Sequence, residues 1–361
     1  MKALVAHAIN ELSVQDVRLD PPQAGEVRVR MAAAGVCHSD LSALNGTIPM
    51  PFPLVLGHEG AGVVVEVGEG VRRTQVGDHV IMSFVPMCGD CYHCLRHESY
   101  LCLKLPRGGM HEDGSSRMHL GDTPLNAFML LGNMAEEVVC PEINVVPVSK
   151  DIPLQVAALI GCGVTTGVGA VLNTAQVSVG STVAVFGCGG VGLACIQGAR
   201  VAGASRIFAI DLSEAKLEMA KRFGATDVLL ADDKTPKAIM KATGGIGVDY
   251  AFEAIGIGAV IAQAVAATRR GGTTVAVGVG SYKDEIKLNA LGFPLSNKHL
   301  SGCMFGSANP RVDFPKLADL HRTGQLDLEG MVTRTYSIDE GVQAFEDLKS
   351  GVNARGVIVF E

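Results

Sequence analysis

The sequence predicts an α/β fold made of a doubly wound parallel sheet and a second, β-rich part. Up to about Thr165, short β-like runs are separated by glycine and proline, which is typical of antiparallel β structure. Beyond Thr165, apolar runs alternate with amphipathic helical segments, which is typical of parallel strands joined by crossover helices. The length of 361 residues suits about two domains, and 48% hydrophobic with 19% charged residues supplies a core and excludes disorder.

In the first part we expect strands over residues 26–33, 62–67 and 79–84, where apolar and β-branched residues alternate with polar ones. Residues 86–127 are rich in Cys, His, Gly and Pro without an apolar period, so an irregular lobe is expected there. In the second part we expect strands at 182–187, 206–211, 248–254 and 273–278, with helices to about residue 202 and over 213–223. The last residues return to a mixed pattern and end in a strand-like run at 356–361.

Charge and hydropathy exclude several functional classes. With 30 Lys+Arg against 37 Asp+Glu, the net charge of −7 argues against a nucleic-acid-binding surface, which needs a concentrated positive field. The N-terminus has no long apolar stretch, and the most apolar run, residues 182–196, is too short to span a membrane. We therefore expect a soluble cytoplasmic protein without membrane contact, whose ten cysteines serve as thiols or metal ligands.

Four cysteines are crowded into a short stretch of the irregular lobe. Cys88, Cys91, Cys94 and Cys102 can surround one tetrahedral Zn²⁺, and a closed four-cysteine site is structural because no position is open to substrate. The alternatives are free or redox-active cysteines, which lack the thioredoxin-like context here, and an iron–sulfur cluster, whose usual spacings differ.

A second candidate metal site is dispersed along the chain. Cys37 in GVCHSD, His58 in GHEGAG and Cys162 in GCGVTTG form a three-ligand set that leaves a fourth position for water or substrate. From spacing alone this site is weakly indicated, because a single cysteine or histidine is more often a core or surface residue.

A glycine-rich loop follows the expected strand at 182–187. Gly187, Gly189 and Gly192, with Gly190 between them, fit the dinucleotide-binding pattern G-x-G-x-x-G, and Asp211 ends the next strand, where a carboxylate can bind the ribose hydroxyls. Because Leu212 offers no arginine to a 2′-phosphate, NAD is favoured over NADP. The alternative is a tight turn without a ligand.

These motifs, in this order, resemble those of the zinc-containing alcohol dehydrogenases of the medium-chain dehydrogenase/reductase family, over essentially the whole chain. The resemblance implies a GroES-like catalytic domain, residues 1–163 and 306–361, around a Rossmann NAD-binding domain, residues 164–305. It also implies two zinc ions per chain, a catalytic one on Cys37, His58 and Cys162 and a structural one on Cys88, Cys91, Cys94 and Cys102. The implied reaction is the reversible oxidation of an alcohol to its aldehyde or ketone with NAD.

The resemblance assigns roles to further positions. It implies that Ser39 accepts the substrate proton, that Glu59 eases ligand exchange at zinc, and that Asp40 orients His58. The implied cofactor contacts are His38, Thr166, Val191, Lys216, Val277, Val279 and Arg355, and the implied substrate-pocket residues are Phe84 and Ile48.

One position departs from the family pattern. Ser42 stands where many members have the histidine that ends the proton relay, so the relay is expected to pass through Ser42, ribose hydroxyls and water or directly to solvent. Similar departures occur among aryl- and benzyl-alcohol dehydrogenases, which makes these the nearest specificity class.

Three other activities are less well supported by the resemblance. Polyol dehydrogenases commonly replace the third cysteine by a carboxylate, and the glutathione-dependent branch differs in the stretch at 103–110. A binding protein on a retired dehydrogenase fold is disfavoured by the intact ligand set.

The expected assembly is a homodimer. In the family, members with a long segment between the positions of Cys102 and Cys162 form dimers. The alternative is that this segment shapes the substrate entrance and has no role in assembly. We expect the run TTVAVG at 273–278 to be an exposed apolar edge strand that pairs across a two-fold axis.

Overall fold

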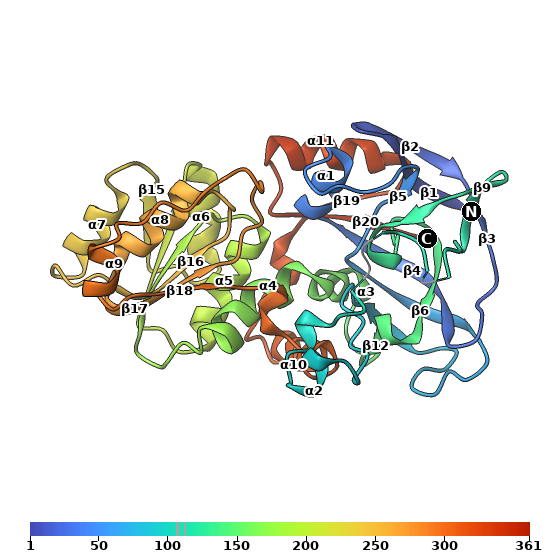
Figure 1. Cartoon of the computed structure of the whole chain (residues 1–361), viewed down its shortest axis with the longest axis horizontal. Coiled ribbons are helices and arrows are strands. Elements are labelled where there is room, and N and C mark those ends of the chain that lie inside the picture. The colour runs from blue at the N-terminus through green and yellow to red at the C-terminus, as the bar shows by residue number, and fades with distance from the viewer. Residues whose placement is uncertain (106–107, 112) are drawn as a thin grey trace. The chain divides into compact units, whose positions relative to one another are not determined.

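The computed structural model describes residues 1–105, 108–111 and 113–361, and within it the chain forms two compact units (Figure 1). Unit 1 comprises Met1–Gly163, Asn309–Gly324 and Leu328–Glu361, and unit 2 comprises Val164–Ala308 and Gln325–Asp327. Part of the stretch at 103–110, used above against the glutathione-dependent branch, lies outside the described residues.

Unit 2 is built on a parallel sheet, as the sequence predicts, and this sheet has two strands more than the four expected above. Its strands are β13 (Thr182–Phe186), β14 (Arg206–Asp211), β15 (Asp227–Leu230), β16 (Val248–Glu253), β17 (Thr268–Ala276) and β18 (His299–Gly302). Their order in the sheet, β15-β14-β13-β16-β17-β18, runs outward in both directions from the neighbours β13 and β16. This is the doubly wound arrangement in which ligands bind where the strand order reverses, at the carboxyl ends of the strands.

The helices of this part of the chain are α4 (Gly163–Gly169), α5 (Gly190–Val201), α6 (Glu214–Arg222), α7 (Thr235–Ala242), α8 (Gly258–Ala267) and α9 (Gly292–Leu295). Of these, α5, α6 and α8 pack directly against strands of the sheet. The local sequence sets both ends of helix α6. At its start, the Ser213 hydroxyl accepts a hydrogen bond from the Lys216 amide. Lys221 and Arg222 occupy its last turn, where positive charge complements the helix dipole.

The expectation for the edge of the sheet is wrong. The first four residues of TTVAVG lie in β17, and β17 is an inner strand because β18 pairs with it in parallel from Thr273–His299 to Ala276–Gly302. The true edge, β18, has the sequence HLSG, which is too short and too polar to stand out as a strand. Three of its four residues are exposed.

Unit 1 is β-rich and contains three sheets. Its strands are β1 (Lys2–Ala8), β2 (Glu11–Asp16), β3 (Arg18–Leu19), β4 (Glu26–Val36), β5 (Leu54–Val55), β6 (Gly60–Val67), β7 (His79–Met82), β8 (Met118–Leu120), β9 (Thr123–Pro124), β10 (Asn126–Ala127), β11 (Glu137–Pro141), β12 (Val145–Pro147), β19 (Val332–Tyr336) and β20 (Arg355–Val359). The largest sheet follows the path β12-β7-β6-β4-β20-β19, with β11 also paired to β4, so β4 is its hub.

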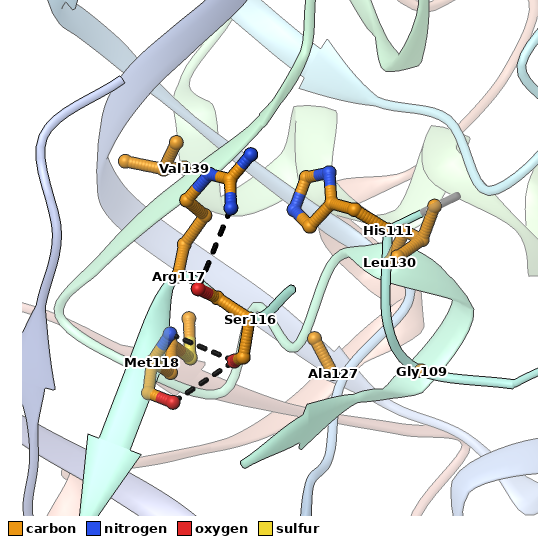
Figure 2. A pocket seen from close by; sticks show the side chains of 8 residues that line it. All are labelled: Gly109, His111, Ser116, Arg117, Met118, Ala127, Leu130 and Val139. Carbon is orange, nitrogen blue, oxygen red and sulfur yellow. Dashed lines mark hydrogen bonds between the residues drawn. The ribbon is translucent and has the colours of Figure 1, made fainter. Parts of the chain in front are cut away.

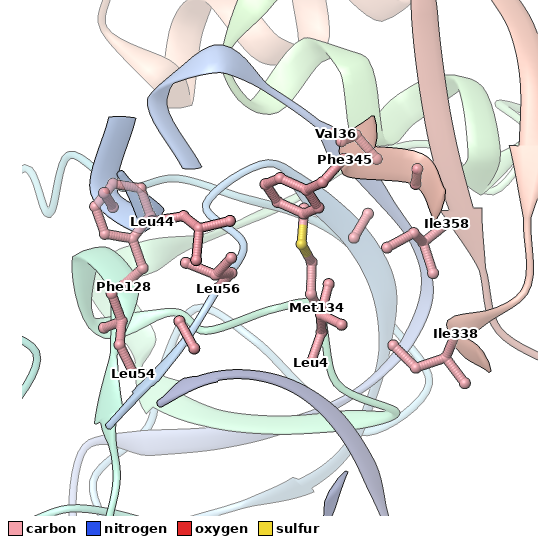
Figure 3. Close-up of a cluster of buried hydrophobic side chains, with 14 of the residues drawn as sticks. Leu4, Val36, Leu44, Leu54, Leu56, Phe128, Met134, Ile338, Phe345 and Ile358 are labelled. Atoms are coloured by element: carbon pink, nitrogen blue, oxygen red, sulfur yellow. The ribbon is translucent and has the colours of Figure 1, made fainter. Parts of the chain in front are cut away.

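The helices of unit 1 are short except near the C-terminus: α1 (His38–Leu44), α2 (Tyr92–Leu95), α3 (Leu154–Ala157), α10 (Pro310–Arg322) and α11 (Gly341–Ser350). A core cluster joins segments from both ends of the chain. Leu4, Phe128 and Met134 belong to the same buried cluster as Phe345 of α11 and Ile358 of β20, and Met134 points toward Phe345 in Figure 3. Burial of these side chains fixes the start and end of the chain together around β4.

Among the described residues, no single helix has the length and apolar composition to cross a membrane. One bent pair of helical segments, Leu154–Gly161 with Gly163–Thr174, meets the criterion by length and composition only.

Candidate functional site

Three ligand-type side chains that are far apart in the sequence converge in unit 1. Cys37 precedes α1, His58 follows β5, and Cys162 ends a 3₁₀ turn over Ala158–Gly161. Their ligand atoms all lie within 4.8 Å of one another, and all three residues are buried. The dispersed set that the sequence only weakly indicates is therefore a compact three-ligand cluster.

The orientation of His58 is set by Asp40. Nδ1 of His58 lies 3.0 Å from Oδ2 of Asp40, whose Oδ1 accepts a hydrogen bond from the Gly57 amide at 2.9 Å. Both side chains are almost completely buried. Both ring nitrogens of His58 are buried without a hydrogen bond among the described residues, so Nδ1 faces Asp40 as an ion-pair contact and Nε2 remains on the other side of the ring. An imidazole held through one nitrogen, with the other directed at two thiols, fits a metal ligand.

The electrostatics of the cluster favour a cation. The neighbouring Cys162 and His58 hold the pKa of the Cys37 thiol well below its ordinary value, against the effect of burial. Burial would lower the pKa of His58, but the charges of Asp40 and Cys37 raise it to about 10. Thiolate, thiol and imidazole donors with a buried negative charge suit Zn²⁺, so the residues present fit this ion.

Glu59 lies next to the same cluster and is completely buried. Its Oε1 accepts a hydrogen bond from the Gly163 amide at 2.9 Å, and its Oε2 forms an ion pair with the guanidinium of Arg355. A Cβ atom on Gly35 would lie 2.5 Å from Oε2, so glycine is required there to admit the carboxylate. Arg355, expected from the resemblance to contact the cofactor, is engaged with Glu59 in this structure.

Two aromatic rings stand edge-on to His58. Phe84 has its ring centroid 5.6 Å away and Phe128 5.4 Å away, at interplanar angles of 78° and 86°. Phe84 is among the expected pocket residues, whereas Phe128 was missed because it lies within an undifferentiated apolar run, AFMLL. The metal cluster is thus flanked by apolar surface.

The remaining expected residues near the cluster lie on or just after α1. His38 is exposed and Ser39 and Ser42 are half-buried, three positions apart, so the two hydroxyls share a face of the helix. Ile48 is tied to this helix because its amide donates to the Ser42 carbonyl at 2.9 Å.

The four cysteines of the lobe also come together. The Sγ atoms of Cys88, Cys91, Cys94 and Cys102 lie within 4.8 Å of one another, and only Cys102 is buried. The backbone amide of Cys88 donates to Sγ of Cys102 at 3.5 Å, and amides around Cys91 lower the pKa of that thiol to about 6. This donor set fits a closed tetrahedral zinc site.

In unit 2, the glycine-rich loop has the backbone that dinucleotide binding requires. Gly187 has φ +93°, and a Cβ atom on Gly192 would lie 1.7 Å from the Gly187 carbonyl oxygen, so helix and strand pack too closely there for a side chain. Around Gly189, a Cβ atom would meet nothing within 4 Å. The loop therefore closes tightly at its first and third glycines and is open at its second, where a pyrophosphate approaches in this motif.

Asp211 ends β14 beside this loop. Its Oδ2 accepts a hydrogen bond from the Cys188 amide at 2.8 Å and its Oδ1 one from the Ser213 amide at 3.0 Å. The carboxylate is half-buried and is thereby fixed at the carboxyl edge of the sheet.

The other expected cofactor residues in unit 2 lie as follows. Thr166 and Val191 lie where α4 and α5 approach closely. A Cβ atom on Gly167, the neighbour of Thr166, would lie 2.4 Å from the Val191 carbonyl oxygen. Lys216 is half-buried in the first turn of α6, Val277 is buried after β17, and Val279 is exposed.

Two family models match the chain. Residues 23–150 match the alcohol dehydrogenase GroES-like domain, and residues 190–322 match the zinc-binding dehydrogenase domain.

Individual proteins are similar over the full length. The chain is 38% identical to an NDMA-dependent alcohol dehydrogenase of Amycolatopsis methanolica (99% of this chain, 98% of the relative). It is 39% identical to an alcohol dehydrogenase class-3 of Cereibacter sphaeroides (99% of both). Among solved structures, a benzyl alcohol dehydrogenase from Acinetobacter calcoaceticus superposes with a TM-score of 0.94 at 32% identity, covering 100% of this chain and 99% of the other.

Proposed function

Because the chain belongs to the zinc-containing alcohol dehydrogenases of the medium-chain dehydrogenase/reductase family, we propose that it interconverts an alcohol and its aldehyde or ketone with NAD. The observation that carries this proposal is the buried cluster of Cys37, His58 and Cys162, whose ligand atoms lie within 4.8 Å of one another. Zinc held by these residues supplies a Lewis acid that lowers the pKa of the substrate hydroxyl, and nicotinamide supplies the hydride acceptor.

The chain's own residues orient the ligands and carry the proton. The Asp40 carboxylate, 3.0 Å from Nδ1 of His58, favours the proton on that nitrogen and leaves the lone pair of Nε2 for the metal. The Ser39 hydroxyl would accept the substrate proton, and Ser42, on the same face of α1, would pass it on toward solvent. We assign to Glu59 the easing of ligand exchange at the metal; its ion pair with Arg355 and its hydrogen bond from the Gly163 amide support a fixed carboxylate beside His58.

The proposed preference for NAD rests on Asp211. A carboxylate at the end of β14 accepts hydrogen bonds from ribose hydroxyls and repels a 2′-phosphate, and the neighbouring Leu212 is apolar and 80% exposed. His38, Thr166, Val191, Lys216, Val277, Val279 and Arg355 remain proposed cofactor contacts.

For the substrate we propose a primary alcohol with an aromatic group. Phe84 and Phe128 present ring edges at His58, Ile48 adds apolar surface near α1, and the solved relative from Acinetobacter calcoaceticus is a benzyl alcohol dehydrogenase. A glutathione adduct is the second candidate, because the chain is also 39% identical, over 99% of both chains, to an S-(hydroxymethyl)glutathione dehydrogenase of Escherichia coli.

The test is NADH formation, followed by absorbance, with benzyl alcohol, ethanol, a secondary alcohol, a polyol and S-(hydroxymethyl)glutathione. We expect the highest kcat/KM with benzyl alcohol and a higher value with NAD than with NADP. A higher kcat/KM for the polyol or the glutathione adduct would overturn the substrate assignment. No turnover with any of them, despite bound zinc, would indicate a binding protein on a dehydrogenase fold.

We also propose a homodimer, now through the exposed edge of β18 rather than through TTVAVG. An edge strand with unpaired backbone groups can pair with its own copy across a two-fold axis. Light scattering should give twice the mass of the chain, and a fourfold mass would overturn the dimer.

A further inference from the structure

Glu253, the last residue of β16, is a completely buried carboxylate that the reaction described above does not use. Its Oε1 accepts hydrogen bonds from the amides of Ile255, Gly256 and Ile257 at 3.0, 2.8 and 3.4 Å. Its Oε2 is buried without a hydrogen-bond partner in the described part of the chain, and burial raises the pKa of the carboxyl group. The Glu253 side chain thus accepts the amide hydrogen bonds of one tight turn, residues 254–257, and stabilises that turn.

That turn is locked to the next one along the sheet. The Glu253 carbonyl accepts from the amides of Val277 and Gly278 at 2.8 and 2.9 Å. Gly256 has φ +91°, and Cβ atoms on Gly278 or Gly280 would each lie 2.1 Å from its backbone. The backbones of the turns after β16 and β17 are therefore in direct contact, with no room for a side chain between them.

The same turn also contacts the glycine-rich loop. A Cβ atom on Gly187 would lie 2.6 Å from Cγ1 of Ile255, so the Ile255 side chain covers the first glycine of the motif. In the sheet, Glu253 pairs with Phe186 of β13 on one side and with Ala276 of β17 on the other. Glu253 therefore lies where the strand order reverses, beneath three loops at the carboxyl edge.

A dinucleotide bound at such an edge lies across the reversal point, with one mononucleotide half on each side. The Gly187–Gly192 loop and Asp211 serve the adenosine half, and the turns after β16 and β17 face the other half. We propose that Glu253 is a positioning residue for the nicotinamide half of NAD, acting through the turns at 254–257 and 277–280. This inference rests on the proposed use of NAD.

The test compares NADH with AMP, which carries only the adenosine half, by isothermal titration calorimetry on the purified full-length protein. In Glu253→Ala, three amides lose their acceptor and the turn at 254–257 is released. We expect the Kd for NADH to rise about tenfold or more while the Kd for AMP changes less than about twofold. Glu253→Gln, which keeps an oxygen acceptor, should retain NADH affinity better than Glu253→Ala.

Asp249, near the other end of β16, provides the matched control. It also accepts several hydrogen bonds, from the Thr182 amide and hydroxyl at 2.8 Å and from Arg269 at 2.7 Å, but it lies at the amino edge of the sheet. Asp249→Ala should lower the melting temperature while both affinities stay within about twofold, since ligands of such sheets bind at the opposite, carboxyl edge.

Should Glu253→Ala fail to fold, Gly278→Ala disturbs the same contact from the neighbouring turn, and it should likewise weaken NADH more than AMP. Equal losses for both ligands, or no loss for either, would overturn the positioning role. If the wild-type protein itself binds no NADH, the proposed cofactor is wrong and this inference falls with it, an outcome already visible before any variant is made.

Discussion

The two cysteine clusters of unit 1 contrast in almost every physical respect. The lobe cluster draws four ligands from Cys88 to Cys102, and three of them are partly exposed. The Cys37, His58 and Cys162 cluster draws three ligands from distant segments, and all are buried. One is formed by a local loop, whereas the other exists only once the β-rich unit has folded.

This difference predicts that one cluster contributes mainly to stability and the other mainly to activity. A local loop with few other elements depends on its metal for its shape, so metal binding there is folding free energy. The ligands of the dispersed cluster stand next to regular elements of the folded unit, Cys37 between β4 and α1 and His58 after β5, and a three-ligand set leaves a fourth position at the metal. We therefore expect loss of the lobe metal to reduce stability and loss of the dispersed metal to reduce activity.

The largest expected effect is that of Cys162→Ser. A serine hydroxyl keeps the volume but is a poor zinc ligand, so bound zinc should fall from about two to about one per chain and kcat/KM by roughly 10³-fold or more. Elemental analysis and steady-state kinetics measure both. The melting temperature should change little, and a variant that keeps both metals and full activity would contradict the assignment of Cys162.

The next effect is the converse, in Cys94→Ser. Zinc should again fall to about one per chain, but the melting temperature should drop by roughly 5 °C or more because the lobe loses the ion that shapes it. Activity of the folded fraction, measured well below the transition, should stay within about threefold of wild type. Equal losses of activity in Cys94→Ser and Cys162→Ser would erase the distinction between the clusters.

The same contrast explains how much could be predicted from sequence. Four cysteines at short spacing, and a G-x-G-x-x-G loop followed by Asp211, lie in continuous stretches, so their chemistry is visible locally. The parallel sheet was predicted because β13 and β14 are apolar runs of the length expected for strands buried on both faces.

Features that depend on tertiary context were missed or misplaced. No local pattern joins Cys37 to Cys162, so that cluster required the family resemblance. Strand β18, HLSG, has one apolar residue in four and forms only because β17 offers it an edge, which is why β17 was wrongly predicted to be the edge. Glu253 ends an apolar strand, where an acidic residue is usually exposed, and only the turn folded over it shows that it is buried.

Asp40→Asn sharpens the comparison by changing one cluster without touching a ligand. The amide can still accept from the Gly57 amide, but its NH₂ group would face Nδ1 of His58 and force that nitrogen to be the acceptor. The proton then moves to Nε2, where it competes with the metal. We expect zinc affinity at this site to fall about 10–100-fold in a chelator competition. The lobe site should release zinc at the wild-type rate, and weakening of both sites together would indicate general unfolding instead.

The smallest expected effect concerns the chain that leaves the lobe. Arg117 donates to both oxygens of Glu26 at 2.8 and 2.7 Å, and both residues are buried. Nδ1 of His111 lies 3.3 Å from the same carboxylate. Figure 2 shows His111 and Arg117 on opposite sides of a small pocket. Below them, the Ser116 hydroxyl forms hydrogen bonds with the Met118 backbone. The Arg117–Glu26 ion pair connects the segment after Cys102 to the start of β4. Part of the attachment of the lobe to the rest of unit 1 is therefore independent of its metal.

Glu26→Gln keeps an acceptor for Arg117 but removes its charge, and should lower the free energy of unfolding by about 1 kcal/mol at neutral pH. Burial opposes ionisation of Glu26, yet hydrogen bonds from Arg117 and the Gln23 amide hold its pKa below the ordinary 4.5. A carboxyl group with a lowered pKa in the folded state stabilises above its unfolded pKa and loses that contribution as the pH falls through the folded value. In urea unfolding, the free energy of unfolding of Glu26→Gln should lie a constant ~1 kcal/mol below that of wild type between pH 6 and 8. This difference should shrink below about pH 4.5, as Glu26 of the wild type takes up a proton. A deficit that grows on acidification would mean that the charge of Glu26 is not what fastens the lobe to β4.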